Sequence, residues 1–423
     1  MTYALRNGGP CRRPSGTIVV HQRTRVVSVQ LPVIGHKTYG RALRQAFADS
    51  RDLEFENYWT SDRREVHARL FNRIMAQRAP IKWLHDRNLD FRRARAELGY
   101  AYFARRLIDR ASREVPIDVL HFHTQTAALL CADYIRRVPT VITTDQTANQ
   151  IALETEHRWR WTHLPSVALE RRPLRLARAV VAFSHWAARS LVQDQGVDPS
   201  RVHVIPPGVD LRNFVPLDGH RERSHGNAKR FLFVGGDFER KGGPLLVDVF
   251  LRRFAQRGME LHLMTNAEGI AIHPQIFVHR DVQAYSTAWR DLFALADIFV
   301  LPTRWEAYGH AYVEAMAAAL PVVGTNISAV PEIVGPDGAA FLIPPDDGQA
   351  LAERLELLVR DADLRRTLGE RGRQRAAANF DAGKSLEQLQ FLFVQLAGKM
   401  GRGDRPSKHS ITNDAQQVFP HHR

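Results

Sequence analysis

Cysteine is scarce in this sequence, which has only Cys11 and Cys131 among 423 residues. The first stands in a polar terminal segment, and the second stands in an apolar run typical of a helix. We therefore expect no structural disulfide. This usage is typical of proteins from a reducing, cytoplasmic compartment.

Long apolar runs are also absent. No stretch reaches the roughly 18 consecutive apolar residues of a membrane-spanning helix. The opening MTYALRNGGPCRRPSG is polar and lacks the apolar centre of a secretory signal, so none is expected. A hydrophobic content of 44% over this length predicts a globular protein of two ordinary domains.

Acidic residues are too few to balance the basic ones, and the net charge is +14. Much of the excess lies in residues 61–115, where 13 arginines and one lysine face seven acids. This region forms either a solvated helical face or a surface for an anionic membrane or an acidic substrate. No nucleic-acid-binding motif and no interleaved aromatic ladder accompany it, so nucleic acid is not an expected partner.

Short apolar strands alternate with amphipathic helices along most of the chain. The alternation stops in the polar segment 216–230 and then resumes. Such a pattern predicts an α/β protein with two doubly wound, Rossmann-like parallel sheets, whose ligands bind beyond the carboxyl ends of the strands. Disordered ends are expected at residues 1–20 and 401–423. The expected strands lie at 24–32, 117–124, 139–147, 177–184, 201–210, 229–236, 259–265, 276–282, 297–303 and 321–325.

The segment EAYGHAYVE places two carboxylates, Glu306 and Glu314, on either side of a helix start. Gly309 permits close backbone approach, and the amides of Gly309, His310 and Ala311 open a helix whose positive end favours a diphosphate. Glu314 lies about 12 Å further along an ideal helix, at ~1.5 Å per residue, and can accept hydrogen bonds from two adjacent ribose hydroxyls. The pattern fits a nucleotide diphosphate that carries a sugar. Two solvated glutamates are the alternative.

A second strand, glycine-rich loop and helix occur in VGGDFERKGG at residues 234–243. The loop ends in Arg240 and Lys241, and cations beside glycines suit a diphosphate leaving group. A basic loop of this kind is often only a turn. Two such junctions in one domain favour a nucleotide site.

These segments resemble a known family. EAYGHAYVEAMAAALPVVGT followed by AVPEIVGPDGAAFLIPPDD is similar to the E-x7-E signature of retaining glycosyltransferases of family 4, which have the GT-B fold. The resemblance covers residues 177–380 well and the N-terminal third in outline. It implies two facing domains across a deep cleft. They are an acceptor-binding domain at 21–215 and, after the linker 216–230, a donor-binding domain at 231–380, with a helix at 381–400 that packs back on the first domain.

The resemblance also implies roles for individual residues. Glu306 would contact the donor sugar near its anomeric carbon, and Glu314 would bind the ribose. Lys241 would neutralise the leaving diphosphate. The family's arginine usually follows the loop glycine directly, but here Gly236 stands after Gly235, so Arg240 is the substitute. The amides of residues 309–311 would contact the distal phosphate. The backbone of residues 279–282 would read the base, with Val282 beneath it. The loop with Gly35, His36 and Lys37 would lie over the diphosphate.

A second departure from the family concerns the N-terminal domain. Many relatives carry a histidine after the third strand, near the acceptor, and PTVITTDQT is expected to place Asp145 there. Asp145 would contact a donor hydroxyl or handle the acceptor proton, or it would simply cap a loop. No metal is required, and the acidic pair Asp361 and Asp363 is expected to cap a helix.

The resemblance therefore implies transfer of a hexosyl-type sugar from a nucleoside-diphosphate sugar to a saccharide or lipid-linked acceptor, in cell-envelope or exopolysaccharide synthesis. No permanently bound cofactor is expected. The protein would be cytoplasmic and would dock on an anionic inner membrane face, unless the apolar residues of the basic region are core. The alternatives are a non-catalytic sugar-nucleotide binder and a sugar-nucleotide epimerase. The apolar residues of the basic region, which would either dock on the membrane or belong to the core, are Phe71, Ile74, Trp83, Leu84, Phe91, Tyr100, Tyr102 and Phe103.

Overall fold

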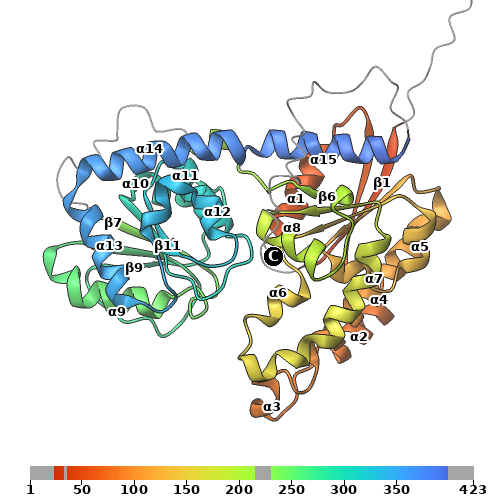
Figure 1. Ribbon diagram of the computed structural model, residues 1–423, viewed down its shortest axis with the longest axis horizontal. Coiled ribbons are helices and arrows are strands. Elements are labelled where there is room, and N and C mark those ends of the chain that lie inside the picture. Colours follow the sequence, from red (N-terminus) through yellow and green to blue (C-terminus); the bar gives the residue numbers. More distant parts are fainter. Residues whose placement is uncertain (1–22, 33–35, 215–229, 399–423) are drawn as a thin grey trace, which may run out of the picture.

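The structure is a computed structural model, and it describes residues 23–32, 36–214 and 230–398. Two six-stranded parallel sheets form two side-by-side domains (Figure 1). The strand orders are β2-β1-β3-β4-β5-β6 in the first domain and β12-β11-β10-β7-β8-β9 in the second. The GT-B expectation is confirmed. The predicted arm, linker and tail lie almost wholly outside the described residues.

The first domain contains β1 (Thr24–Gln30), α1 (His36–Phe47), β2 (Leu53–Trp59), α2 (Val66–Met75), α3 (Lys82–Asp86), α4 (Arg92–Glu114), β3 (Val119–His123), η1 (Gln125–Ala128), α5 (Ala132–Arg137), β4 (Thr140–Thr144), α6 (Ala148–Ala152), η2 (His157–His163), α7 (Leu164–Leu176), β5 (Ala179–Ala182), α8 (His185–Gln193), η3 (Pro199–Arg201), β6 (Val202–Val204) and η4 (Leu211–Phe214).

The second domain contains β7 (Arg230–Val234), α9 (Gly243–Arg253), η5 (Ala255–Arg257), β8 (Glu260–Met264), β9 (Ile276–His279), α10 (Thr287–Leu295), β10 (Ile298–Leu301), α11 (His310–Ala317), β11 (Val322–Thr325), α12 (Val330–Val334), η6 (Pro336–Phe341), β12 (Leu342–Ile343), α13 (Gly348–Arg360) and α14 (Ala362–Asn379). The last helix, α15 (Ala382–Leu396), belongs to the first domain by its packing.

The strand β2 was missed in the sequence. Its segment LEFENYW is an edge strand in which only the first side chain is buried, so it lacks the apolar run of the central strands. The omission shifts the strand count. The strand that precedes Asp145 is therefore β4, not the third strand, and the third strand is β3, which ends at His123. The placement of Asp145 after the third strand was wrong.

Both faces of the first sheet are covered. Val27 and Val29 of β1 pack in one cluster with α4, whereas Val26 packs on the opposite face with Leu43 of α1. Alternate residues of a strand point to opposite faces, so these helices enclose the sheet on two sides.

Helix α15 completes the second of these faces. The chain crosses back beside Val209, whose amide donates to the Phe380 carbonyl at 2.8 Å. Figure 1 shows α14 over the second domain and α15 continuing over the first. Fully buried Phe393 of α15 contacts the rings of Phe47 and His121.

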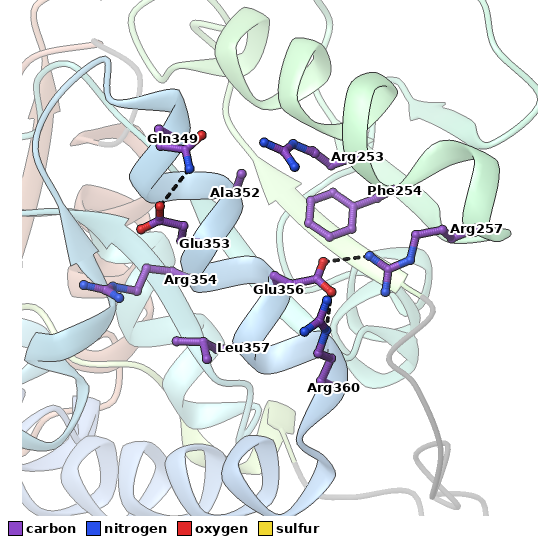
Figure 2. A pocket seen from close by; sticks show the side chains of 10 residues that line it. All are labelled: Arg253, Phe254, Arg257, Gln349, Ala352, Glu353, Arg354, Glu356, Leu357 and Arg360. Atoms are coloured by element: carbon purple, nitrogen blue, oxygen red, sulfur yellow. Dashed lines mark hydrogen bonds and ion pairs between the residues drawn. The ribbon is translucent and has the colours of Figure 1, made fainter.

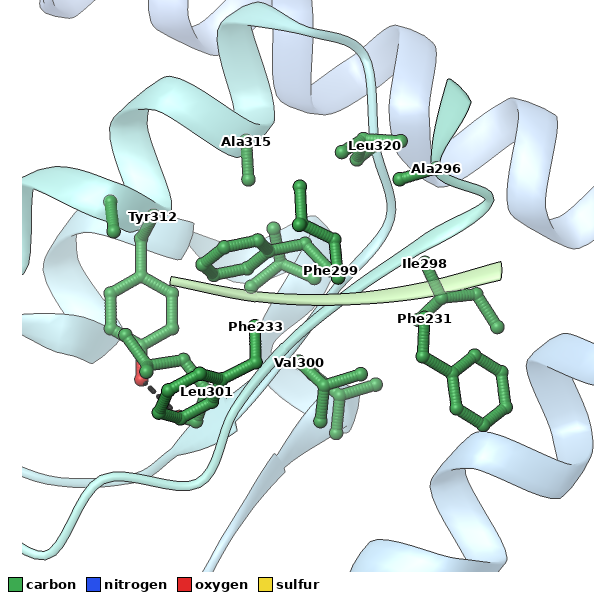
Figure 3. Packing of buried hydrophobic residues seen from close by; sticks show 14 of the residues in the cluster. Phe231, Phe233, Ala296, Ile298, Phe299, Val300, Leu301, Tyr312, Ala315 and Leu320 are labelled. Atoms are coloured by element: carbon green, nitrogen blue, oxygen red, sulfur yellow. Dashed lines mark hydrogen bonds between the residues drawn. The ribbon is translucent and has the colours of Figure 1, made fainter. Parts of the chain in front are cut away.

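The core of the second domain surrounds β7 and β10 (Figure 3). Buried Tyr312 of α11 belongs to this core, and its hydroxyl donates to the Leu301 carbonyl at 2.6 Å. A Cβ atom at Gly324 would lie 2.7 Å from the Tyr312 ring, so the glycine lets the helix approach the sheet. Packing of this ring fixes where α11 begins.

Truncation of Phe393 should uncouple α15 from the first domain. We expect Phe393→Ala to lower the free energy of unfolding by about 3–5 kcal/mol, because it removes a fully buried ring and leaves a cavity. Urea unfolding monitored by circular dichroism measures the change. Glu387→Ala, an exposed position of the same helix, is the control. Equal stability of the two variants would contradict the packing role of α15.

Candidate active site

The two glycine-containing loops predicted to bind a diphosphate lie against each other. Gly242, with φ of 74°, approaches the Pro302 carbonyl so closely that a Cβ atom would lie 1.9 Å from it. The Arg304 amide donates to the Arg240 carbonyl at 2.9 Å. The loop after β7 and the loop after β10 thus form one site at the carboxyl edge of the second sheet, as parallel strands require.

Lys241 and Glu306 form an ion pair across this junction. The Lys241 Nζ atom lies 3.0 Å from Glu306 Oε2, and the two side chains are only 16% and 13% exposed. A Cβ atom at Gly235 would lie 2.7 Å from the Lys241 side chain, so this glycine makes room for the lysine. Glu306, assigned to the sugar, and Lys241, assigned to the leaving group, therefore lie in contact at a partly desolvated position.

Arg240 is tied to the same loops. Its guanidinium pairs with Asp237 at 3.2 Å and donates to the Trp305 carbonyl, next to Glu306. Its neighbour Gly236 has open space where a Cβ atom would lie. A larger residue would fit at position 236, so packing does not explain why glycine stands where the family usually has arginine.

The start of α11 depends on Gly309, which has φ of 80°. A Cβ atom there would lie 2.7 Å from the Tyr312 ring and 3.1 Å from the Glu306 side chain. The turn therefore brings Glu306 under the helix start, where the amides of His310 and Ala311 open the helix. The first amides of a helix lack carbonyl partners one turn earlier, and they carry the positive end of its dipole. This end can hold a phosphate.

Glu314 is buried one turn inside α11. It accepts a hydrogen bond from the Tyr285 hydroxyl at 3.1 Å, and Tyr285 also lies 3.2 Å from His310 Nε2. Burial raises the pKa of Glu314 to about 7, against the effects of Tyr285 and the Lys241 ammonium. Burial and Lys241 lower the pKa of His310 to about 4. No local pattern in the sequence pointed to Tyr285.

Asp145 follows β4 in the first domain. Its carboxylate and that of Glu306 both act electrostatically on Glu154, which follows α6. Partial desolvation, Asp145 and Glu306 raise the pKa of Glu154 to about 7, whereas Arg93 and Arg240 lower it. The residue keeps an exposed surface, so solvent limits this rise. The sequence analysis missed Glu154, because nothing in its local pattern separates it from a solvated acid.

Buried His123 ends β3 near the same cleft. Its ring lies 4.8 Å from that of Tyr39 and 5.8 Å from that of Phe183, which in turn contacts Tyr308 at 5.8 Å. This aromatic row joins the first domain to the loop that precedes Gly309. The strand HFHT was recognised from the sequence, but His123 was not assigned a place in the site.

Three remaining candidates are less defined. Gly35 lies outside the described residues, and Lys37, in the first turn of α1, is exposed. Val282 is half-buried and packs against the core of the second domain. Elsewhere, Asp361 accepts a hydrogen bond from the Leu364 amide at 2.8 Å, so its role as a helix cap is confirmed.

A cavity of about 500 Å³ lies away from these loops, between α9 and α13 (Figure 2). Glu356 accepts from both Arg257 and Arg360, and Gln349 donates to Glu353. Much of its charge is paired internally, and it contains none of the predicted site residues. The candidate site, at the loops after β7 and β10, is therefore separate from this cavity.

Comparisons with known proteins point to glycosyltransferases. A model described as Glycosyltransferase Family 4 matches residues 36–213, and a model described as Glycosyl transferases group 1 matches residues 220–375. An MMP alpha-(1->4)-mannosyltransferase of Mycolicibacterium hassiacum is 30% identical over 51% of this chain and 53% of its own length. An alpha-maltose-1-phosphate synthase of Mycolicibacterium smegmatis is 29% identical over 64% of this chain and 77% of its own. The match thus spans about half of the first relative.

Solved structures share the fold. Sucrose-phosphate synthase from Thermosynechococcus elongatus has a TM-score of 0.68 and 17% identity, over 89% of this chain and 100% of its own. Anabaena HepE in complex with UDP-glucose has a TM-score of 0.63 and 17% identity, over 88% of this chain and 100% of its own.

The raised pKa of Glu314 predicts a pH-dependent stability difference. The folded protein disfavours the ionised carboxylate, so wild-type stability falls as pH rises from about 4.5 to about 7. Glu314→Gln keeps an acceptor for Tyr285 but does not titrate. We expect the variant to gain about 3 kcal/mol relative to wild type between pH 4.5 and pH 8.

Urea unfolding at several pH values measures this difference. Glu353→Gln, an exposed glutamate of α13, should show no such trend. Parallel pH profiles for wild type and Glu314→Gln would contradict the burial of an ionisable carboxylate at this position.

Proposed function

The chain belongs to the family 4 glycosyltransferases and has their GT-B fold, and on this basis we propose that it is a retaining, metal-independent hexosyltransferase. Its donor is a nucleoside-diphosphate sugar. The observation that carries the proposal is the Lys241–Glu306 ion pair, formed where two glycine-containing loops meet beneath the start of α11. This position suits the bond between a sugar and its diphosphate.

In this proposal the donor binds mainly to the second domain. The α11 amides and Lys241 hold the diphosphate, Glu314 and Tyr285 meet the ribose, and Val282 lies under the base. Lys241 is already close to Glu306, so it can neutralise the departing diphosphate without a large rearrangement. Arg240 adds positive charge beside the same loop.

Transfer then proceeds on one face of the sugar. The bond from the anomeric carbon to the diphosphate oxygen breaks, the acceptor oxygen bonds to the same carbon, and its proton passes to the departing diphosphate. Glu306 stabilises the positive charge that develops on the sugar and orients its hydroxyls. Asp145 of the first domain orients the acceptor hydroxyl. Positioning and charge stabilisation supply most of the rate.

The acceptor is a saccharide or a lipid-linked saccharide, used in cell-envelope or exopolysaccharide synthesis. Named relatives include a mannosyltransferase and a Staphylococcus aureus capsular polysaccharide biosynthesis glycosyltransferase, which support this class. A cytoplasmic location is part of the proposal, since sugar nucleotides are made there. No helix in the described residues is long and apolar enough to cross a membrane.

Peripheral attachment to an anionic membrane completes the proposal. Val66, Leu70 and Ile74 form a stripe along α2 with exposures of 62%, 59% and 53%. Exposed Arg69 and Arg73 flank this stripe. Apolar side chains with flanking cations suit the interface of an anionic bilayer.

The apolar residues assigned to this region from the sequence divide between surface and interior. Phe71 and Trp83 are exposed at 40% and 53%, as is Ile74 of the stripe. Phe103 is fully buried in the core. Leu84, Phe91, Tyr100 and Tyr102 are half-buried. Phe103 is therefore a core residue, whereas Phe71, Ile74 and Trp83 lie on the surface and are available for the proposed docking.

Loss of the Glu306 charge should abolish most of the activity. A thermal-shift panel of UDP-, GDP-, ADP- and TDP-sugars first identifies the donor nucleotide. With that donor, we expect Glu306→Gln to lower turnover at least ~100-fold, while the nucleoside diphosphate still raises Tm. Glu353→Gln is the control. Near-normal turnover in Glu306→Gln would remove Glu306 from the mechanism, and no binding in the panel would count against the activity itself.

Attachment to membranes should require both the stripe and its charge. We expect wild type to float with phosphatidylglycerol vesicles at low salt but not with phosphatidylcholine, and to be released near 1 M salt, where screening shortens to about 3 Å. Leu70→Ser with Ile74→Ser should lower the bound fraction several-fold. Leu357→Ser, an exposed leucine of the second domain, is the matched control. Equal flotation of the two variants would reject the α2 surface.

A further inference from the structure

The start of α8 in the first domain is held by a carboxylate from the second domain. Glu332 Oε1 accepts a hydrogen bond from the His185 amide at 2.8 Å, and Oε2 accepts one from the Trp186 amide at 2.9 Å. Figure 1 shows α12, which carries Glu332, on the side of the second domain that faces α8. One carboxylate of the second domain thus accepts hydrogen bonds from the first domain with both of its oxygens.

The contact is favourable for a physical reason. Ser184 caps α8 and accepts from the Ala187 amide at 3.0 Å, so the amides of His185 and Trp186 need other acceptors. A carboxylate at the positive end of a helix gains both charge-assisted hydrogen bonds and dipole stabilisation. Here the acceptor comes from another domain, so this stabilisation exists only while the domains are together.

Glu332 is itself firmly placed. The Arg375 guanidinium of α14 donates to the Glu332 carbonyl at 2.6 Å and to the Ile333 carbonyl at 2.8 Å. A Cβ atom at Gly335, which follows α12, would lie 2.5 Å from the Arg375 guanidinium, so the glycine admits the arginine. The short helix therefore presents the carboxylate from a fixed base.

The contact leads directly to the reacting groups. The Trp186 ring packs edge-on against the Trp305 ring at 6.0 Å, and Trp305 precedes Glu306. The Trp186 carbonyl accepts from Gln150 at 2.8 Å. Gln150 belongs to the capping box at Thr147 that starts α6, two residues after Asp145. Trp186 thus contacts the loop that carries Glu306 directly, and it contacts the segment after Asp145 through Gln150.

We propose that Glu332 is a positioning residue that holds the two domains closed and keeps Asp145 of the first domain opposite Glu306 of the second. The inference rests on the proposed function, because it assigns the closed cleft to sugar transfer. The donor-binding groups assigned in the proposed function lie mainly in the second domain. Loss of the contact should therefore impair transfer to the acceptor and leave nucleotide binding largely unchanged.

The two sides of the contact allow a reciprocal test. Glu332→Ala removes both acceptors. His185→Pro removes one donor from the other domain, at the first helical position, where proline is tolerated. His185→Ala keeps the amide and changes only the side chain. Glu370→Ala, an exposed glutamate of α14, is the matched control.

Two readouts are needed, one of which is independent of activity. Small-angle scattering of the full chain should show an increased radius of gyration in Glu332→Ala and His185→Pro, but not in His185→Ala or Glu370→Ala. With the donor identified by the panel, kcat for transfer should fall at least ~10-fold in the first two variants, while the Kd of the nucleoside diphosphate changes less than about twofold.

The outcomes separate the two proposals. Unchanged scattering in both Glu332→Ala and His185→Pro would overturn the positioning role, whatever the activity. The same holds if His185→Ala is as impaired as His185→Pro, or if nucleotide affinity falls in step with kcat. If wild type transfers no sugar but the scattering changes occur as expected, the contact stands as a domain closure and the proposed enzymatic activity is what fails.

Discussion

The ion pair between Lys241 and Glu306 depends on how the sheet of the second domain brings two loops together. Lysine and glutamate come from loops that follow two neighbouring strands, β7 and β10, and their side chains meet because parallel strands end at one edge. Breaking a partly buried pair by removing one partner leaves an uncompensated charge, whereas well-packed apolar residues would often serve stability as well. An arrangement of this kind is explained better by a charged ligand than by stability.

Glycines at two positions allow the loops to approach closely enough for this ion pair, and larger residues there would clash. Gly242 lies directly on the Pro302 carbonyl, and Gly309 turns the chain between the Glu306 side chain and the Tyr312 ring. Tyr312 is in turn fixed by the core through Leu301. The placement of the charged pair is therefore a consequence of packing that extends from the sheet to the helix start.

Much of this was predictable from the sequence, because it rests on local patterns. Apolar strands followed by glycines and helix starts gave both loops, and the spacing of Glu306 and Glu314 gave the helix between them. The edge strand β2 was not predictable by the same means, since only its first side chain is buried and it includes Glu54 and Glu56. Tyr285 and Glu332 were missed because each acts through residues far away in the sequence.

The site is costly to the folded protein on both sides of the cleft. Glu314 is buried where its charge is disfavoured, and the more exposed Glu154 of the first domain also has a raised pKa. Such groups weaken the folded protein and would gain hydrogen-bond donors from the hydroxyl groups of the proposed sugar-nucleotide ligand. Glu332 acts in the opposite direction, since its two hydrogen bonds favour the closed arrangement that brings these carboxylates together. Glu332 thus satisfies the start of α8 only while the two domains are together, and a ligand that contacted both domains would shift the protein further toward closure.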